Sequence, residues 1–201
     1  MELIPKQTIG AQSDNLHSIS CENISVAKKK YNTACERLMR INEWSKTENN
    51  VLQTVFTLCD SEGKEVSRNP KINDHIKIDL MGPGSQNGDG YDWVQIEEIV
   101  IKKEESEKDD LEFTSIKVRP AKCPINNKTE VAHFFNSEAT STFIVSRMNT
   151  KVTAEIHGRN EEPNKKTAQV TDNLRNTLVA KIAAVKLSDV QWKNLCIAFL
   201  S

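Results

Sequence analysis

The stretch Ser141–His157, STFIVSRMNTKVTAEIH, decides the fold. Its two halves, residues 141–147 and 151–157, are rich in β-branched residues and are joined by a short Met-Asn-Thr connection. β-forming residues on both sides of a short polar connection predict a β-hairpin. We therefore expect two adjacent antiparallel strands here, and the second strand leads directly into the segment His157–Glu162, HGRNEE.

Further strand-like runs precede this hairpin. In each run the β-forming residues recur with a period close to two, and the runs are separated by turn sequences such as residues 60–63, DSEG. Such spacing predicts short strands joined by antiparallel connections. The runs cover residues 51–58, 72–80, 93–101, 111–118 and 131–135.

Both ends of the chain instead have a helical period. From Ile24 to Ile41 the apolar residues recur in steps of three and four, which predicts a helix over about Ser20–Lys46. A coiled-coil seam for dimerisation is an alternative, but the small residues Ala27 and Ala34 favour packing against a sheet. Two more helices are predicted towards the C-terminus, at about residues 171–185 and 189–200.

The order of one helix, seven or eight strands and two helices predicts an α+β fold. We expect a curved antiparallel sheet or a partly open barrel, with one N-terminal and two C-terminal helices packed against it. Residues 1–18 are polar and aperiodic, and we interpret them as a loose N-terminal arm. Residues 19–201 are interpreted as a single domain.

Composition excludes several classes of partner. The chain has 27 Lys and Arg residues against 28 Asp and Glu residues, so no overall positive charge attracts nucleic acid or an anionic membrane. No apolar run approaches the roughly 18 residues that span a bilayer, and no leader sequence is recognised at the start, so we expect a cytoplasmic protein. The five cysteines form no C-x-x-C pair, which favours reduced thiols over a disulfide framework or a zinc site.

A glycine-dense loop, residues 82–93, is the first candidate site. Four of the seven glycines in the chain lie in it, which implies an unusual backbone path. A phosphate-binding loop is disfavoured because a strand follows it instead of a helix, and a calcium loop lacks its closing glutamate. A tight double turn at the end of a sheet is favoured. The four glycines are Gly82, Gly84, Gly88 and Gly90.

Five polar or aromatic residues are the candidate ligand contacts. Aromatic side chains where a loop meets a strand are typical of recognition sites, and an arginine beyond a strand end can bind an anion. The five residues are Tyr91, Asp92, Trp93, Arg159 and Asn160.

His157 is the candidate catalytic residue. It can act as a general base if Glu161 or Glu162 orients its ring, with Arg159 holding an anion. The favoured alternative is structural, in which ion pairs of Arg159 and Glu161 attach this loop to the sheet.

No metal or cofactor is expected. His75, His133 and His157 stand in no H-x-H or H-E-x-x-H pattern, and no nucleotide-binding motif is present.

Several segments resemble a family of conserved hypothetical bacterial proteins. The resemblance covers most of residues 50–200, and it implies no activity and no role for any residue. The segments that carry it are Gly82–Gly84, Gly90–Val94, Val118–Pro120, Ala132–Phe135, Ala139–Phe143, His157–Glu161 and Pro163–Asn164.

The sequence favours a non-catalytic cytoplasmic binding or protein-interaction module, which holds an unidentified protein or small molecule. One alternative is a small hydrolase or isomerase that uses His157 with Glu161 or Glu162. A second alternative is a structural subunit of a bacterial assembly, with a homodimer through a terminal helix as one form of it.

Overall fold

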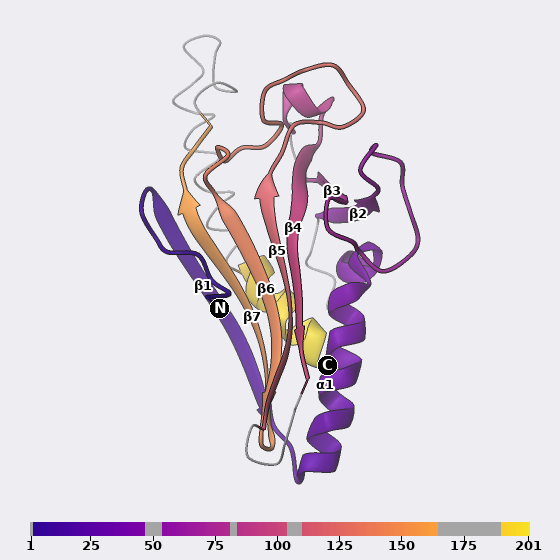
Figure 1. Cartoon of the computed structure of the whole chain (residues 1–201), viewed down its shortest axis with the longest axis vertical. Coiled ribbons are helices and arrows are strands. Elements are labelled where there is room, and N and C mark those ends of the chain that lie inside the picture. Colours follow the sequence, from indigo (N-terminus) through magenta and orange to yellow (C-terminus); the bar gives the residue numbers. More distant parts are fainter. Residues whose placement is uncertain (1, 47–53, 81–83, 104–109, 165–189) are drawn as a thin grey trace.

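The computed structural model describes the chain apart from residues 1, 47–53, 81–83, 104–109 and 165–189. It confirms an α+β fold built on one antiparallel sheet of seven strands, with the order β1-β7-β6-β5-β4-β3-β2 (Figure 1). The elements are β1 (Ala11–Ser20), α1 (Ile24–Met39), the 3₁₀ helix η1 (Ile41–Lys46), β2 (Val55–Cys59), β3 (His75–Asp79), the 3₁₀ helix η2 (Gln86–Gly88), β4 (Asp92–Lys102), β5 (Leu111–Pro120), β6 (Thr140–Met148), β7 (Lys151–Glu161) and a C-terminal helix at residues 190–200.

The sheet is open. β1 and β2 are its two edges and do not pair with each other. Of the two predicted architectures, the protein therefore has the open sheet and not the partly open barrel. Every neighbouring pair of strands is antiparallel, as expected from hairpin connections.

The hairpin predicted at residues 141–157 is confirmed as β6 and β7. The two strands pair from Met148 with Lys151 at the turn to Thr140 with Arg159 at the far end. Asn149 lies in the turn with φ +55°, a left-handed conformation that asparagine tolerates better than most residues.

The predicted first helix is also confirmed. α1 begins at the cap residue Asn23, whose side chain accepts a hydrogen bond from the backbone N–H of Val26 at 3.0 Å. The α-helix ends at Met39, and the last part of the predicted span forms the 3₁₀ helix η1. α1 buries four of the residues that the helical period selects, Ala27, Tyr31, Ala34 and Leu38, whereas Ile24 at the start of the period is 47% exposed.

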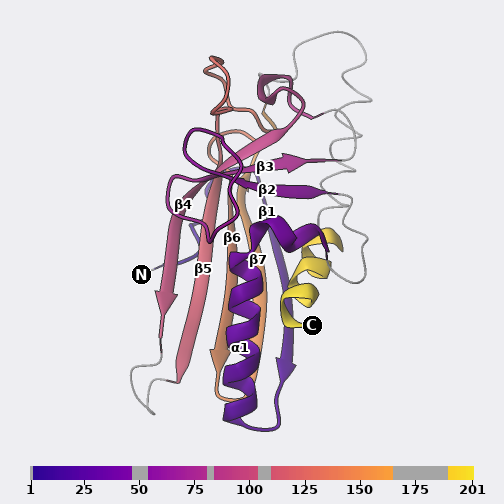
Figure 2. The ribbon, with the colours of Figure 1, turned by 90° about the vertical axis from the view of Figure 1, so that its right-hand side faces the viewer.

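One main core lies between the sheet and the helices. Trp44 of η1 lies at its centre, with ring centroids 4.8 Å from Phe143 and 5.8 Å from Phe199 of the C-terminal helix. Figure 2 shows α1 and the C-terminal helix beside each other, and Arg37 of α1 donates to the carbonyl of Ala198 at 3.3 Å. Both helices therefore cover the same face of the sheet.

The loose N-terminal arm is a wrong prediction from residue 11 onwards. Ala11–Ser20 form the edge strand β1, which pairs with β7 along its length. The preceding residues are held too, because the side chain of Asn160 accepts from the backbone N–H of Thr8 at 2.8 Å. Gln7 in turn accepts from the N–H of Asn160 at 2.9 Å. Ladder pairing supplies the order that the polar sequence of the segment does not predict.

Of the two helices predicted near the C-terminus, one is confirmed. The structure describes the last helix at residues 190–200, whereas the predicted helix at 171–185 lies outside the described residues. No helix in the described part of the chain is both long enough and apolar enough to cross a membrane.

Candidate functional site

The candidate site lies on the sheet face that points away from α1. Side chains alternate between the two faces of a strand, and Ile156 and Phe143 point into the main core. The residues next to Ile156 and Phe143 in the sequence, such as His157 and Thr142, therefore point to the other face, which we call the open face. The ladder register aligns one row of these residues across five strands: Asp14, His157, Thr142, Lys117 and Glu98.

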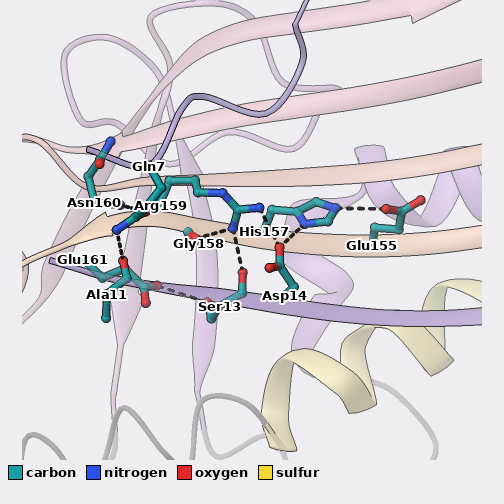
Figure 3. A network of polar contacts seen from close by, with 10 residues as sticks. All are labelled: Gln7, Ala11, Ser13, Asp14, Glu155, His157, Gly158, Arg159, Asn160 and Glu161. Carbon is teal, nitrogen blue, oxygen red and sulfur yellow. Dashed lines mark hydrogen bonds and ion pairs between the residues drawn. The ribbon is translucent and has the colours of Figure 1, made fainter. Parts of the chain in front are cut away.

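His157 is held between two carboxylates (Figure 3). Its Nδ1 lies 2.5 Å from Oδ1 of Asp14 on β1, and its Nε2 lies 2.9 Å from Oε2 of Glu155 on its own strand. Ionised carboxylates only accept hydrogen bonds, so both ring nitrogens donate and the ring is the imidazolium form. A histidine bound in this way has no free lone pair for a general base.

Two opposing effects set the pKa of His157. Burial of the ring lowers the pKa, but the hydrogen bonds and charges of Glu155 and Asp14 outweigh burial and hold the pKa above its ordinary value. The cluster therefore favours the protonated form of His157 over the neutral form.

Arg159 lies two residues along β7 and completes the cluster. Its Nη2 lies 2.7 Å from Oδ1 of Asp14, and its Nη1 donates to the carbonyls of Gly158 and Ser13 at 2.7 and 3.1 Å. Burial raises the pKa of Asp14, but hydrogen bonds from His157 and Arg159 outweigh it, and this pKa lies below its usual value. Arg159 thus links β7 to β1 through Ser13 and Asp14. This role is close to the structural alternative, in which Arg159 attaches its loop to the sheet.

The two glutamates predicted to orient His157 do not contact it. Glu161 accepts a hydrogen bond from the hydroxyl of Ser13 at 3.2 Å, and its carboxylate lies over Gly158, where any Cβ would overlap it. Regular alternation would place Glu161 on the same face as His157, but the left-handed backbone of Asn160 and the register shift between Ala11 and Ser13 interrupt it, and the Glu161 carboxylate lies on the Gly158 side of the sheet. Glu162 accepts from the side-chain amide of Asn136 at 3.0 Å. The catalytic pairing predicted for His157 is therefore wrong.

The chain itself covers part of the open face. Residues 2–5 line a shallow hollow together with Ile144 and Arg159, and Ile144 is only 6% exposed although it points away from the helices. Asn160 does not face a ligand in this arrangement, since its side-chain oxygen accepts from Thr8 and Ile9. Its backbone is left-handed, with φ +56°.

Deprotonation of His157 is expected to lower the free energy of unfolding as the pH rises. The folded state holds the His157 proton more tightly than the unfolded chain, whose ordinary pKa is about 6.5. The contribution of His157 to the free energy of unfolding is therefore complete below about pH 6.5 and is lost as the pH rises through the folded pKa. We expect urea unfolding between about pH 5.5 and 9 to show this loss in the wild type and not in His157→Gln.

The difference in unfolding free energy between the wild type and His157→Gln separates the effect of His157 from that of the other buried histidines. Burial lowers the pKa of His75 and His133, so their contributions have the opposite pH dependence and cancel in the difference. Equal pH dependence in wild type and variant would contradict the protonated cluster.

The glycine-dense loop forms a tight turn around η2. The N–H of Gly88 donates to the carbonyl of Ser85, and the N–H of Tyr91 donates to that of Gly88, both at 3.0 Å. A Cβ at Gly84 would overlap the backbone carbonyl of Gly90, and Gly90 itself has φ +94°. The predicted Gly82 lies outside the described residues.

The aromatic residues after this loop are mostly packing residues. Trp93 is fully buried in a second, smaller core with Cys59, Cys123 and Ala132, and its indole N–H donates to the Gly88 carbonyl at 3.3 Å. A residue buried in this way presents no surface to a partner.

Tyr91 and Asp92 flank that core. Asp92 is only 2% exposed, whereas Tyr91 is half-buried, with the ammonium of Lys77 5.1 Å from its ring centroid. In the described part of the chain no hydrogen bond or ion pair joins these residues to Arg159 or Asn160, so the two predicted parts of the ligand site are not brought together.

The three histidines considered for a metal lie in different surroundings. His133 is buried against Phe134 and accepts from the backbone N–H of Phe135 at 3.0 Å. His75 lies in a cleft beside β3, and His157 lies in the carboxylate cluster. Within the described residues, no group of three or more His, Cys, Asp or Glu side chains is placed to hold a metal ion.

Sequence reasoning missed the two residues that control His157. Asp14 is 143 positions away in the chain, and only the pairing of β1 with β7 brings it to the ring. Glu155 was detectable, because residues two apart on a strand share a face.

Comparison with known proteins gives one structural likeness. No family model matches the sequence, and no curated protein matches it. Among solved structures, the chain is similar to the hypothetical protein jhp0584 from Helicobacter pylori, with 10% sequence identity and a TM-score of 0.44. The alignment covers 94% of this chain and 88% of that chain.

Proposed function

We propose that this protein is a non-catalytic binding module that holds a protein partner on its open face. The observation that carries the proposal is the row across this face, in which every residue except Thr142 is charged or titratable, and on which neither described helix packs. Lys117 lies 2.9 Å from Glu98 and Arg119 lies 2.5 Å from Glu97, so charges of both signs are fixed in position on neighbouring strands. A fixed pattern of mixed charge favours a partner with the complementary pattern.

The state of His157 supports binding over catalysis. A general base needs a nitrogen that can take up a proton, and both nitrogens of this ring are already bound to carboxylates. The hydrolase or isomerase alternative would require the ring to leave both Asp14 and Glu155. The cluster instead supports a rigid face, which reduces the entropy lost when a partner binds.

Native mass spectrometry of the tagged full-length protein, purified gently from cells that express it naturally, tests the proposal. We expect a stoichiometric protein partner with the wild type. Lys117→Glu reverses a charge in the row and should remove the partner. Lys29→Glu, on an exposed position of α1, is the matched control and should retain it.

The other outcomes point elsewhere. Loss of the partner with Lys29→Glu but not with Lys117→Glu would move the interface to the helices and favour the assembly-subunit alternative. A mass of two copies of the chain would support a homodimer instead. Absence of any protein partner in all three preparations would overturn the proposal.

A further inference from the structure

A cleft of about 510 Å³ lies at the end of the sheet where β3, β4 and β5 are neighbours. The ladder pairs His75 with Gln95 and Gln95 with Arg119, so these three residues line the cleft in one row. The segment after β5 forms another wall and contributes Lys122. In Figure 1 this segment lies beyond the upper ends of β4 and β5.

The polar groups of the cleft divide into satisfied and free ones. Arg119 is satisfied, since it lies 2.5 Å from Glu97 and donates to the carbonyl of Ser137 at 2.8 Å. The ammonium of Lys122 and the side-chain amide of Gln95 have no hydrogen-bond partner within the part of the chain that the structure describes. Arg119 and Glu97 pair with each other, whereas the exposed ammonium of Lys122 offers a positive group at the cleft, which favours an anionic group there.

His75 supplies a group of the opposite kind. His75 is only 6% exposed, and its Nδ1 lies 3.4 Å from the carbonyl oxygen of Asp60, which can only accept. Burial lowers the pKa of His75 and, with a smaller contribution from the charge of Lys122, outweighs the Asp60 carbonyl and the charges of Asp74 and Asp60, which raise it, so the neutral ring is favoured. With the proton on Nδ1, Nε2 has a lone pair and no partner among the described residues. Nε2 of His75 can therefore accept a hydrogen bond from a ligand group that donates one.

We infer that this cleft binds a small hydroxycarboxylic acid, whose carboxylate accepts from Lys122 and Gln95 and whose hydroxyl donates to Nε2 of His75. An ammonium and an amide N–H₂ beside one free acceptor match these two groups. The apolar side chains of Pro120, Pro124 and Val131 line the same cleft and suit the carbon skeleton. This inference goes beyond the proposed partner-binding function and does not depend on it.

NMR titration of the ¹⁵N-labelled full-length protein tests the inference with matched probes. Glycolate carries both groups, acetate carries only the carboxylate, and inorganic phosphate is an anion of another class. We expect glycolate to shift the Nε2 resonance of His75 saturably and to bind up to about tenfold more tightly than acetate. Lys122→Ala should weaken glycolate binding by about tenfold or more, whereas Lys29→Ala on α1 should leave it unchanged.

The remaining outcomes overturn the inference. No saturable shift with glycolate would show that the cleft does not take this class. Equal affinity for glycolate and acetate would remove the role of His75, and phosphate binding as tightly as glycolate would replace the carboxylate assignment with general anion binding. Lys122 is exposed, so its variant is expected to fold, and an unchanged amide spectrum outside the cleft checks this.

Discussion

Replacing Trp44 by alanine is expected to lower the free energy of unfolding by about 3–5 kcal/mol. The indole is only 2% exposed and packs against Phe56, Phe143 and Phe199, with ring centroids 4.8 to 5.8 Å away. These contacts come from the sheet and from the C-terminal helix, so the cavity left by alanine lies between elements that cannot collapse together easily. The indole N–H also donates to the carbonyls of Arg37 and Leu38, at 3.2 Å each.

Urea unfolding followed by circular dichroism measures this effect. Trp44→Phe keeps an aromatic ring in the core and should cost less than Trp44→Ala. Ile101→Ala is the control, because Ile101 of β4 is 57% exposed and should change the free energy of unfolding by no more than about 0.5 kcal/mol. A Trp44→Ala protein as stable as Ile101→Ala would contradict the central position of Trp44 in the core.

The parts of the fold with a regular local pattern could be predicted from the sequence. The apolar period from Ala27 to Leu38 selects the buried face of α1, and β-branched residues on both sides of Asn149 select the β6–β7 hairpin. Both patterns lie within one element or between neighbours in the chain, so no long-range contact is needed to read them.

The edge strand β1 could not be predicted in the same way. Residues such as Ser13, Asp14 and Asn15 have low strand propensity, and β7 supplies the ladder partner from more than 130 positions away. Polar side chains on an edge strand also limit unwanted pairing with other chains. The same pairing brings Asp14 to His157, so missing the strand also meant missing the site.

The candidate site shows why residue types alone do not define chemistry. Trp93 follows a glycine-dense loop, where recognition residues are common, yet β4 places its ring in the second core. The shifted pKa of His157 agrees with the general expectation for functional groups. In this protein the shift arises from two carboxylates that occupy both ring nitrogens, and it therefore does not by itself indicate catalysis.

A second large effect is expected from Arg147→Met, which should lower the free energy of unfolding by about 3–5 kcal/mol. The Arg147 side chain on β6 is fully buried, with Nη1 2.8 Å from Asp110 and Nε 2.5 Å from Glu112. Nη1 also donates to the carbonyl of Asn149 at 2.9 Å, which fixes the β6–β7 turn. Methionine fills much of the same volume but leaves the carboxylates of Asp110 and Glu112, which are 17% and 13% exposed, without their counter-charge, and this uncompensated charge is the main cost.

Neutralising the carboxylates separates charge from packing. A triple variant that adds Asp110→Asn and Glu112→Gln to Arg147→Met removes the charges that the methionine leaves unpaired, so urea unfolding should show much of the lost stability restored. The double variant Asp110→Asn with Glu112→Gln, which keeps Arg147, leaves the buried guanidinium without these two counter-charges and should be less stable than the triple variant. If the triple variant were instead less stable than Arg147→Met, the cost would lie in packing and in the turn at Asn149, and the electrostatic account of this buried cluster would be wrong.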